Sequence, residues 1–465
     1  MIAHEVVVVG AGPAGISAAM EASAAGARVL LIDEGPAVGG QIYRQLAPEL
    51  RPRTGDPGDH YGAESAPLFA GLGAAGAEVW SDTEVWGVFP ERVLALHRGG
   101  RSLRVAAGAL VLATGAYDRP VAFPGWTLPG VVTAGGTTAL IKSQRVLPGH
   151  RVVLAGTGPL LLAAAAALVR GGADVAGIAV AASRTAFLGL LRRPAALGKA
   201  FDVMATLRRA GVPMWMGHGI VRVEGDGAVE RAVLAEWDAA WRVVPDTERV
   251  VEADTVAIGY GLVPSSELAQ LAGCEMTYRA GQGGWVPVAA AERLMATSVA
   301  GVFVAGDGAG VAGADAGRLQ GRLAGLGAAR HVGRVAERDA SARAKRPLRD
   351  LQKLDSFRTA LERIHTPGPG LFELVQDDTI VCRCEEITAG EVRQAVEDGA
   401  RLVTEVRAGT RCGMGLCQGR ICIPTVAGLV ERWGQEPAET AGRLTARPPV
   451  RPLPVTALAS EADTE

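Results

Sequence analysis

The chain has 465 residues, 48% of them hydrophobic, and its 47 Lys and Arg residues are balanced by 49 Asp and Glu residues. The hydrophobic content excludes a wholly disordered chain. The net charge of −2 argues against a general nucleic-acid binder, which would carry a basic excess. At about 150 residues per domain, the length predicts about three domains.

No targeting segment is expected, because the strand-like run Val6–Val9 begins almost at Met1 and leaves no room for a signal peptide. The apolar stretch 152–169 contains Gly156, Gly158 and Pro159 near its start. It is therefore better explained as a buried strand, a glycine turn and a helix than as a transmembrane segment. We expect a cytoplasmic protein that contacts a membrane at most peripherally, through a partner or an acceptor.

The N-terminal residues predict a strand at 5–9, a helix at 13–25 and a second strand at 28–33. The turn between the first strand and the helix reads Gly10-Ala-Gly12-Pro-Ala14-Gly15. In such a turn the first glycine permits the bend, the second lets a pyrophosphate approach the backbone, and the third lets helix and strand pack closely.

An acidic residue at the end of the second strand completes this pattern. Asp33 is placed to accept hydrogen bonds from ribose hydroxyls, and Glu34 is the alternative because strand boundaries are predicted only to within a residue or two. Since strand, turn, helix and acid fall in register, the segment predicts a nucleotide site.

The pattern occurs a second time further along the chain. Gly156 repeats Gly10 and Ala253 repeats Gly108, at offsets of 146 and 145 residues. Nearly equal offsets at both ends predict two nested Rossmann-like domains in an α/β fold. In the repeat, however, Leu161 replaces the third glycine and the second strand ends in AVAAS without an acid, so we expect its nucleotide recognition to be degenerate.

The C-terminal part holds five of the six cysteines, as Cys382-Arg-Cys384 and then Cys412, Cys417 and Cys422. Four thiolates suffice for zinc or for an iron–sulfur cluster, so one of the five is spare. Zinc ribbons favour CxxC pairs, which leaves structural zinc as the alternative interpretation. Backbone N–H groups at the nearby glycines 413, 415 and 419 could bond to the sulfurs. The isolated Cys274 is expected in a core.

Three further segments strengthen the nucleotide assignment. Thr114-Gly115 and Gly306-Asp307 each follow an apolar run, and Gly39-Gly40-Gln41 follows the acid. In this order the segments resemble the two-dinucleotide-binding flavoproteins over about residues 1–330. The resemblance implies non-covalent FAD and a contact of Asp307 with its ribityl chain. The cofactor-binding residues it implies are Gly10, Gly12, Ala14, Gly15, Asp33, Glu34, Gly40, Gln41, Thr114, Gly115, Gly306 and Asp307.

The cysteine module resembles the bacterioferritin-associated-ferredoxin type of [2Fe–2S] domain. Together with the motifs GGQIYR, GYGLVPSSEL, CRCEE and TRCGMGLCQGRIC, nearly the whole chain resembles the α subunits of opine oxidases and of dye-linked proline or hydroxyproline dehydrogenases, and the B subunit of hydrogen cyanide synthase. The resemblance implies Cys382, Cys384, Cys412 and Cys417 as cluster ligands and Cys422 as the spare thiol.

These observations predict five parts. They are a FAD-binding domain at 1–120 and 265–345, an inserted NAD(P)-binding-like domain at 121–264, a linker at 346–377, a [2Fe–2S] domain at 378–434 and a Pro-rich tail at 435–465. A long helical segment is expected at about 315–345. We expect the apolar tail to pack on a folded surface, because proline limits the entropy lost on docking.

The resemblance implies an electron-transfer component of a heteromeric amine or imino-acid dehydrogenase acting on CH–NH bonds. Its partner would be a flavoprotein resembling D-amino-acid or sarcosine oxidases, with an external electron acceptor. No acid–base pair or nucleophile can be assigned in this chain. The alternatives are a self-contained NAD(P)H-dependent reductase, an iron–sulfur sensor, and a first site that holds another adenine nucleotide.

Overall fold

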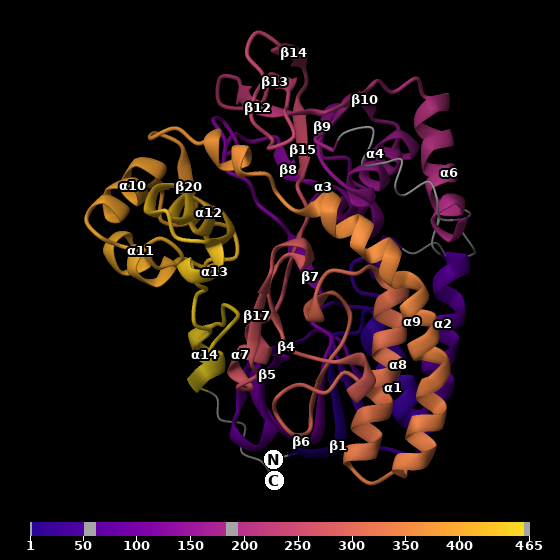
Figure 1. Ribbon diagram of the computed structural model, residues 1–465. Coiled ribbons are helices and arrows are strands. Elements are labelled where there is room, and N and C mark those ends of the chain that lie inside the picture. The colour runs from indigo at the N-terminus through magenta and orange to yellow at the C-terminus, as the bar shows by residue number, and fades with distance from the viewer. Residues whose placement is uncertain (1, 51–61, 183–193, 460–465) are drawn as a thin grey trace. The chain divides into compact units, whose positions relative to one another are not determined.

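The computed structural model describes residues 2–50, 62–182 and 194–459. The chain forms two compact units (Figure 1). The first consists of residues 1–117, 263–358 and 446–465, and the second of residues 118–262 and 359–445. Each unit is therefore assembled from segments that are far apart in the sequence.

The first unit is built on a seven-stranded sheet in the order β3-β2-β1-β6-β5-β4, with β19 pairing with β6. Its strands are β1 (Ile2–Val9), β2 (Val29–Ile32), β3 (Glu78–Trp80), β4 (Thr83–Phe89), β5 (Val93–Arg98), β6 (Arg101–Leu112) and β19 (Val302–Val304). The strands β1 and β2 run parallel, with Val9 opposite Ile32. Continuous buried valines in β1 are typical of a parallel strand that is covered on both faces.

Helices cover this sheet, and two of them pack unusually closely. The described helices of this unit are α1 (Pro13–Ala24), α2 (Gly62–Ala75), α7 (Glu267–Leu271), α8 (Ala314–His331), the first part of α9 (Glu337–His365) and α14 (Val455–Ala459). A Cβ on Gly321 of α8 would lie 2.0 Å from the carbonyl oxygen of Ala14, and one on Gly325 would lie 2.2 Å from that of Ala18. Glycines in α8 therefore let its backbone touch α1, as Figure 1 illustrates.

The helical segment expected at about 315–345 is two helices, α8 and α9. The break includes Gly333, whose φ of +76° ends α8. Two hairpin strands, β17 (Met276–Arg279) and β18 (Gly284–Pro287), and the short pair β7 (Ala116–Asp118) and β16 (Leu262–Pro264) complete the connections.

The second unit contains the predicted repeat. A five-stranded sheet runs in the order β11-β10-β9-β15-β8, and an antiparallel three-stranded sheet crosses over from it. The strands are β8 (Val131–Thr133), β9 (Arg151–Gly156), β10 (Asp174–Val180), β11 (Met214–Met216), β12 (His218–Glu224), β13 (Arg231–Glu236), β14 (Arg249–Glu252) and β15 (Thr255–Gly259). The described helices of this repeat are α3 (Ala134–Ala139), continued by a π-helical turn, α4 (Pro159–Gly171) and α6 (Pro194–Arg209). The apolar stretch 152–169 is β9 followed by α4, as predicted.

The cysteine module belongs to this same second unit. It contains β20 (Ile380–Cys382), β21 (Ile387–Thr388), α10 (Ala389–Glu397), α11 (Val403–Thr410), α12 (Ile423–Gly434) and α13 (Ala438–Ala441). Thr388 stands three residues before Glu391, a spacing that predicts a capping box, and the two residues exchange side-chain-to-backbone hydrogen bonds at the start of α10. The segment predicted as a linker at 346–377 contains most of α9 and a 3-10 turn, Pro369–Glu373.

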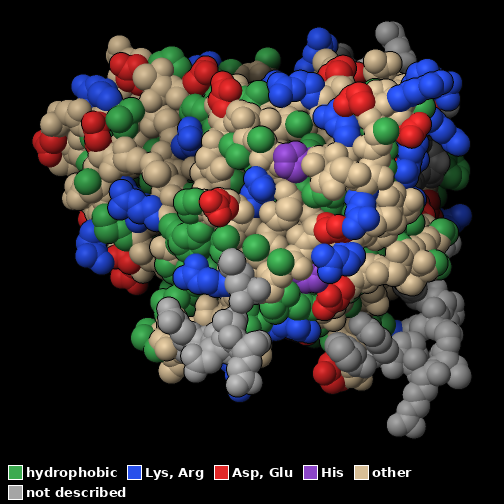
Figure 2. All heavy atoms as spheres, turned by 90° about the horizontal axis from the view of Figure 1, so that it is seen from below, with side chains coloured by type: hydrophobic (Ala, Val, Ile, Leu, Met, Phe, Trp, Pro, Cys, Tyr) green, Lys and Arg blue, Asp and Glu red, His purple; other side chains and the backbone are tan. Residues whose placement is uncertain are grey.

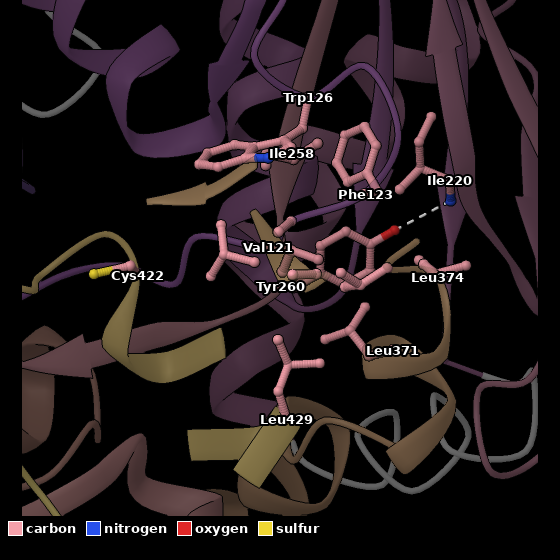
Figure 3. Packing of buried hydrophobic residues seen from close by; sticks show 14 of the residues in the cluster. Val121, Phe123, Trp126, Ile220, Ile258, Tyr260, Leu371, Leu374, Cys422 and Leu429 are labelled. Carbon is pink, nitrogen blue, oxygen red and sulfur yellow. Dashed lines mark hydrogen bonds between the residues drawn. The ribbon is translucent and has the colours of Figure 1, made fainter. Parts of the chain in front are cut away.

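One hydrophobic core joins the inserted domain and the cysteine module (Figure 3). Tyr260 from the inserted domain lies among Phe123, Leu371 and Leu374, and Leu429 of α12 closes the cluster from below. The backbone N–H of Ile220 donates to the Tyr260 hydroxyl at 3.2 Å. The Tyr260 ring stacks on Trp237, with ring centroids 5.8 Å apart. Because the core draws on both parts, neither part buries its apolar surface alone.

The surface is charged with both signs. In Figure 2, basic and acidic side chains are interspersed over the face that is seen, without a field of one sign. Within the described parts of the chain, no helix has the length and apolar character needed to cross a bilayer.

Candidate cofactor sites

The loop between β1 and α1 forms a cradle at the carboxyl end of the sheet. Gly10 has a φ of +99°, and a Cβ there would lie 2.3 Å from the carbonyl oxygen of Ala113. A Cβ on Gly15 would lie 1.7 Å from the carbonyl oxygen of Gly10. Both glycines are thus required by the protein's own packing.

Gly12 is different, because nothing in the described parts of the chain requires it to lack a side chain. A Cβ at this position would lie 3.9 Å from the Cα of Gly40, an ordinary contact. Gly12 is the N-cap of α1, and its φ of −74° is available to any residue. The open space beside Gly12 at the helix N-terminus therefore fits a diphosphate, which the backbone N–H groups and the helix dipole favour.

The remaining predicted segments converge on this cradle. A Cβ on Gly40 would lie 2.8 Å from the Cα of Gly12, and one on Gly306 would lie 2.8 Å from the Cβ of Ala14. A Cβ on Gly308 would lie 2.8 Å from the Thr114 hydroxyl oxygen. Thr114 in turn donates to the carbonyl oxygen of Ser265 at 2.6 Å. Segments from three distant parts of the sequence thus close around one site.

The two acids after β2 have different surroundings. The carboxylate of Asp33 accepts hydrogen bonds from the backbone N–H groups of Ala11 and Gly35, so it holds the glycine loop in place. Burial raises its pKa despite these two bonds. Glu34 is more than half exposed and forms an ion pair with Arg451 at 3.0 Å. Of the two acids, Glu34 has the carboxylate that faces outward.

The other predicted residues also have identifiable positions. Asp307 is partly buried, and its carboxylate accepts hydrogen bonds from the N–H groups of Ala312 and Gly313 at 2.9 and 3.0 Å. Desolvation raises its pKa despite these bonds. Gly115 has a φ of +69° and open space around its Cα. The side chain of Gln41 is exposed and accepts a hydrogen bond from Arg44.

The five clustered cysteines lie in two groups. The sulfurs of Cys382, Cys412 and Cys422 all lie within 4.8 Å of one another and are buried. Cys384, which is exposed, is hydrogen-bonded to Cys417. Cys422 is the predicted spare thiol, yet its sulfur lies within 4.8 Å of the sulfurs of both Cys382 and Cys412.

The environment of the thiols suits a metal centre. The hydrogen bond to Cys422 raises the pKa of Cys382, and burial raises it further. Without a metal the Cys382 thiol therefore stays protonated, and metal binding would release its proton. The N–H of Gly413 donates to the Cys382 sulfur and that of Gly419 to the Cys417 sulfur, as the sequence suggested for these glycines. Such donors stabilise the negative charge of a thiolate-bound cluster.

A tryptophan of the inserted domain, to which the sequence assigned no role, contacts the cysteine module. Trp126 of the inserted domain donates its indole N–H to the carbonyl oxygen of Ile380 at 2.6 Å. The guanidinium of Arg383, between the first two cysteines, lies 5.3 Å from the Trp126 ring centre. No local sequence signal connects residues so far apart, so this contact could not be predicted from the sequence.

In the repeat, Leu161 replaces the third glycine of the loop that corresponds to the cradle. Leu161 is fully buried, and its Cδ1 would lie 3.4 Å from a Cβ on Gly259. The strand β10 is followed by the buried Ala181 and Ala182. The predicted end of this stretch, at 183, lies outside the described residues.

Two family models match the chain. Residues 4–331 match the pyridine nucleotide-disulphide oxidoreductases, and residues 380–432 match the BFD-like [2Fe–2S] binding domain. The cradle and the thiol group fit the cofactors that these matches indicate, FAD and a [2Fe–2S] cluster.

Full-length relatives are also found. The chain is 36% identical to the A subunit of opine oxidase from Rhizobium meliloti (strain 1021) and 33% identical to the hydrogen cyanide synthase subunit HcnB of Pseudomonas aeruginosa. Each alignment covers 97% of both proteins. The crystal structure of L-proline dehydrogenase from P. horikoshii superposes with a TM-score of 0.70 at 21% identity, covering 98% of this chain and 79% of that one. At this identity the superposition supports the fold.

Proposed function

The chain belongs to the family that includes the A subunit of opine oxidase and the HcnB subunit of hydrogen cyanide synthase, and from this premise we propose that it is the electron-transfer component of a heteromeric amine or imino-acid dehydrogenase. The observation that carries the proposal is the presence of a dinucleotide cradle and a thiol group in one chain. When bound, the [2Fe–2S] cluster passes single electrons and the FAD takes one or two, so together they supply a route between a two-electron donor and an acceptor.

The partner in this proposal is an amine-oxidising flavoprotein, and an external acceptor removes the electrons. The relatives named as subunits support the existence of a partner. Substrate oxidation would release two electrons and two protons on the partner, and the electrons alone would pass through this chain. We place the complex in the cytoplasm, where the thiols remain reduced until metal binds.

For the nucleotide, we propose that the backbone around Gly12 holds the diphosphate and that Glu34 accepts the ribose hydroxyls. Asp33 would support the site indirectly by holding the glycine loop, because its carboxylate already accepts hydrogen bonds from the N–H groups of Ala11 and Gly35. Thr114, Gly115, Gly306 and Asp307 would line the flavin side, with Gly40 beside the diphosphate and Gln41 at the rim.

For the cluster, we propose ligation by Cys382, Cys384, Cys412 and Cys417. The position of Cys422 supports an alternative set in which it replaces Cys412. Serine variants separate the two sets. If the first set is right, Cys422→Ser keeps the iron and acid-labile sulfide and Cys412→Ser loses them. The opposite pattern establishes Cys422 as the ligand, and zinc without sulfide would reject both sets.

The test of the function is a comparison of the isolated chain with the complex. We expect the chain alone, offered proline, hydroxyproline, glycine or opines with an artificial dye, to reduce no dye, whereas addition of the partner flavoprotein restores reduction. Substantial reduction by the chain alone would contradict the division of labour. Rapid bleaching of the flavin by NADH or NADPH would favour the alternative of a self-contained reductase.

A further inference from the structure

The C-terminal tail is anchored on the first unit, next to the acids that follow β2. Val450 is 4% exposed and belongs to the core beneath β4 and β5. Its backbone N–H donates to the carbonyl oxygen of Trp86 at 2.9 Å, and this hydrogen bond fastens the tail to the edge strand β4. The N–H of Ala446 contacts the Gln270 side chain in α7, and in Figure 1 the tail runs past α7 to α14.

Arg451, the residue after Val450, carries its positive charge to the candidate nucleotide site. The Arg451 guanidinium lies 3.0 Å from the Glu34 carboxylate. Glu34 also lines an open pocket of about 370 Å³ with Asp82, Glu84 and His97. This pocket lies at the carboxyl end of β2, on the same edge of the sheet as the glycine cradle. Asp82 is tied to the loop after β2, since its N–H donates to the carbonyl oxygen of Gly35 at 3.0 Å.

The charge of this pocket poses a problem for a nucleotide. Three carboxylates line it, and a bound dinucleotide carries a negatively charged diphosphate nearby. The carboxylates and the diphosphate carry charges of the same sign and repel each other, and the repulsion is strongest where water is displaced. A positive charge from the tail reduces this repulsion and leaves the Glu34 carboxylate oriented as a hydrogen-bond acceptor.

We propose that Arg451 is a cofactor-positioning residue, contributed by the C-terminal tail, that orients Glu34 and slows the release of the adenosine end of FAD. Val450 fixes the tail on β4, and this anchor places the neighbouring guanidinium at the pocket. The tail is thereby a latch on the nucleotide site. The inference rests on the FAD site and not on which substrate the complex oxidises.

The expected size of the effect follows from exposure. The Glu34 side chain is 57% exposed and that of Arg451 29%, so the pair resembles a surface ion pair and its contribution is screened by salt. Exposed pairs of this kind change an equilibrium by about fivefold or less. Arg451→Ala should therefore accelerate FAD release by about threefold to fivefold at low salt, and the difference should shrink as salt is raised.

The test measures FAD release from the full-length holoprotein by flavin fluorescence after dilution. Arg447→Ala is the matched control, because Arg447 is an exposed arginine of the same tail. We expect Arg447→Ala to behave as the wild type, Arg451→Lys to retain part of the effect, and Arg451→Ala to add nothing in a Glu34→Gln background. Equal release from Arg451→Ala and the wild type would overturn the proposal, as would equal acceleration by both alanine variants.

A second measurement tests the latch without substituting a residue. The Val450 amide, bonded to Trp86, should exchange with deuterium more slowly in the holoprotein than in the FAD-free protein. Equal exchange in both states would also overturn the proposal. Neither measurement needs the substrate or the partner. A negative result in these assays is therefore distinguishable from a failure of the proposed function. If denaturation releases another adenine nucleotide, the same assays are performed with that nucleotide.

Discussion

The chain contains the same nucleotide-binding architecture twice, and the two copies differ at the places where a nucleotide would bind. In the first copy, Gly12 leaves open space and an outward-facing acid follows β2. In the second copy, the buried Leu161 replaces the third glycine of the loop, and alanines follow β10. The strands and crossover helices that define the fold are present in both, so the fold alone does not require a ligand.

The second copy instead packs against the cysteine module. Its Tyr260, Phe123 and Trp237 lie in one core with residues of the module, and Trp126 bonds to the backbone just before Cys382. We infer that the inserted domain serves mainly to hold the cluster. The comparison thus assigns one copy to the flavin and the other to the cluster, and variants of each should act separately.

The largest expected effect is loss of the cluster without loss of the flavin. Cys384→Ser removes a thiolate that belongs to both proposed ligand sets, so the cluster should be lost completely. Because metal binding stabilises its module, hydrogen exchange should increase in residues 378–434 while β1 stays protected. Iron and sulfide analysis with a flavin absorbance spectrum checks this. Simultaneous loss of FAD would show that the two copies are not independent.

The converse variant is Gly12→Val. The added side chain fits the protein but occupies the space expected for the diphosphate, so FAD should be lost and the cluster kept. Gly73→Ala is the control, since this exposed helical glycine has open space around it. If Gly12→Val retained stoichiometric FAD, the cradle would not be the binding site.

A smaller effect concerns the shared core of the second unit. Leu371 is 1% exposed, and Leu371→Ala should lower the free energy of local unfolding by about 2–5 kcal/mol. Hydrogen exchange should increase together in β13 of the inserted domain and in α10 of the module. Val250→Ala, at an exposed position of β14, should change this free energy by about 0.5 kcal/mol or less. An effect confined to α10 would contradict a common core.

The smallest expected effect is the loss of stability on removing one hydroxyl group from the shared core. Tyr260→Phe keeps the aromatic stacking but leaves the Ile220 N–H without its acceptor, which should cost about 1 kcal/mol. Exchange of the Ile220 amide measures this loss directly. No change at that amide would mean that the hydrogen bond adds nothing to the core.

Features that depend on neighbouring residues could be predicted from the sequence. The glycine turn and the capping box of α10 each arise within about thirty residues, where chain geometry is restrictive. Their positions agree with the structure to within a few residues.

Features that depend on distant contacts could not be predicted. Arg451 meets Glu34, and Trp126 meets Ile380, only because the fold brings together segments from opposite parts of the chain. The position of Cys422 at the start of α12 follows from the turns between Cys412 and α12, which include Gly413 and Gly419 at positive φ. Spacing alone does not determine which sulfurs such turns bring together.

The division of the chain into two interleaved units has a consequence for biosynthesis. The first unit needs residues 446–465 as well as its N-terminal strands, and the second needs residues 359–445 to complete a core begun at 118. During N-to-C synthesis, neither unit has all of its parts until the last of these segments have left the ribosome. Apolar strands such as β1 and β15 therefore stay partly exposed until the segments that pack on their units have been synthesised. Chains released by a ribosome that stalls late should be prone to aggregation.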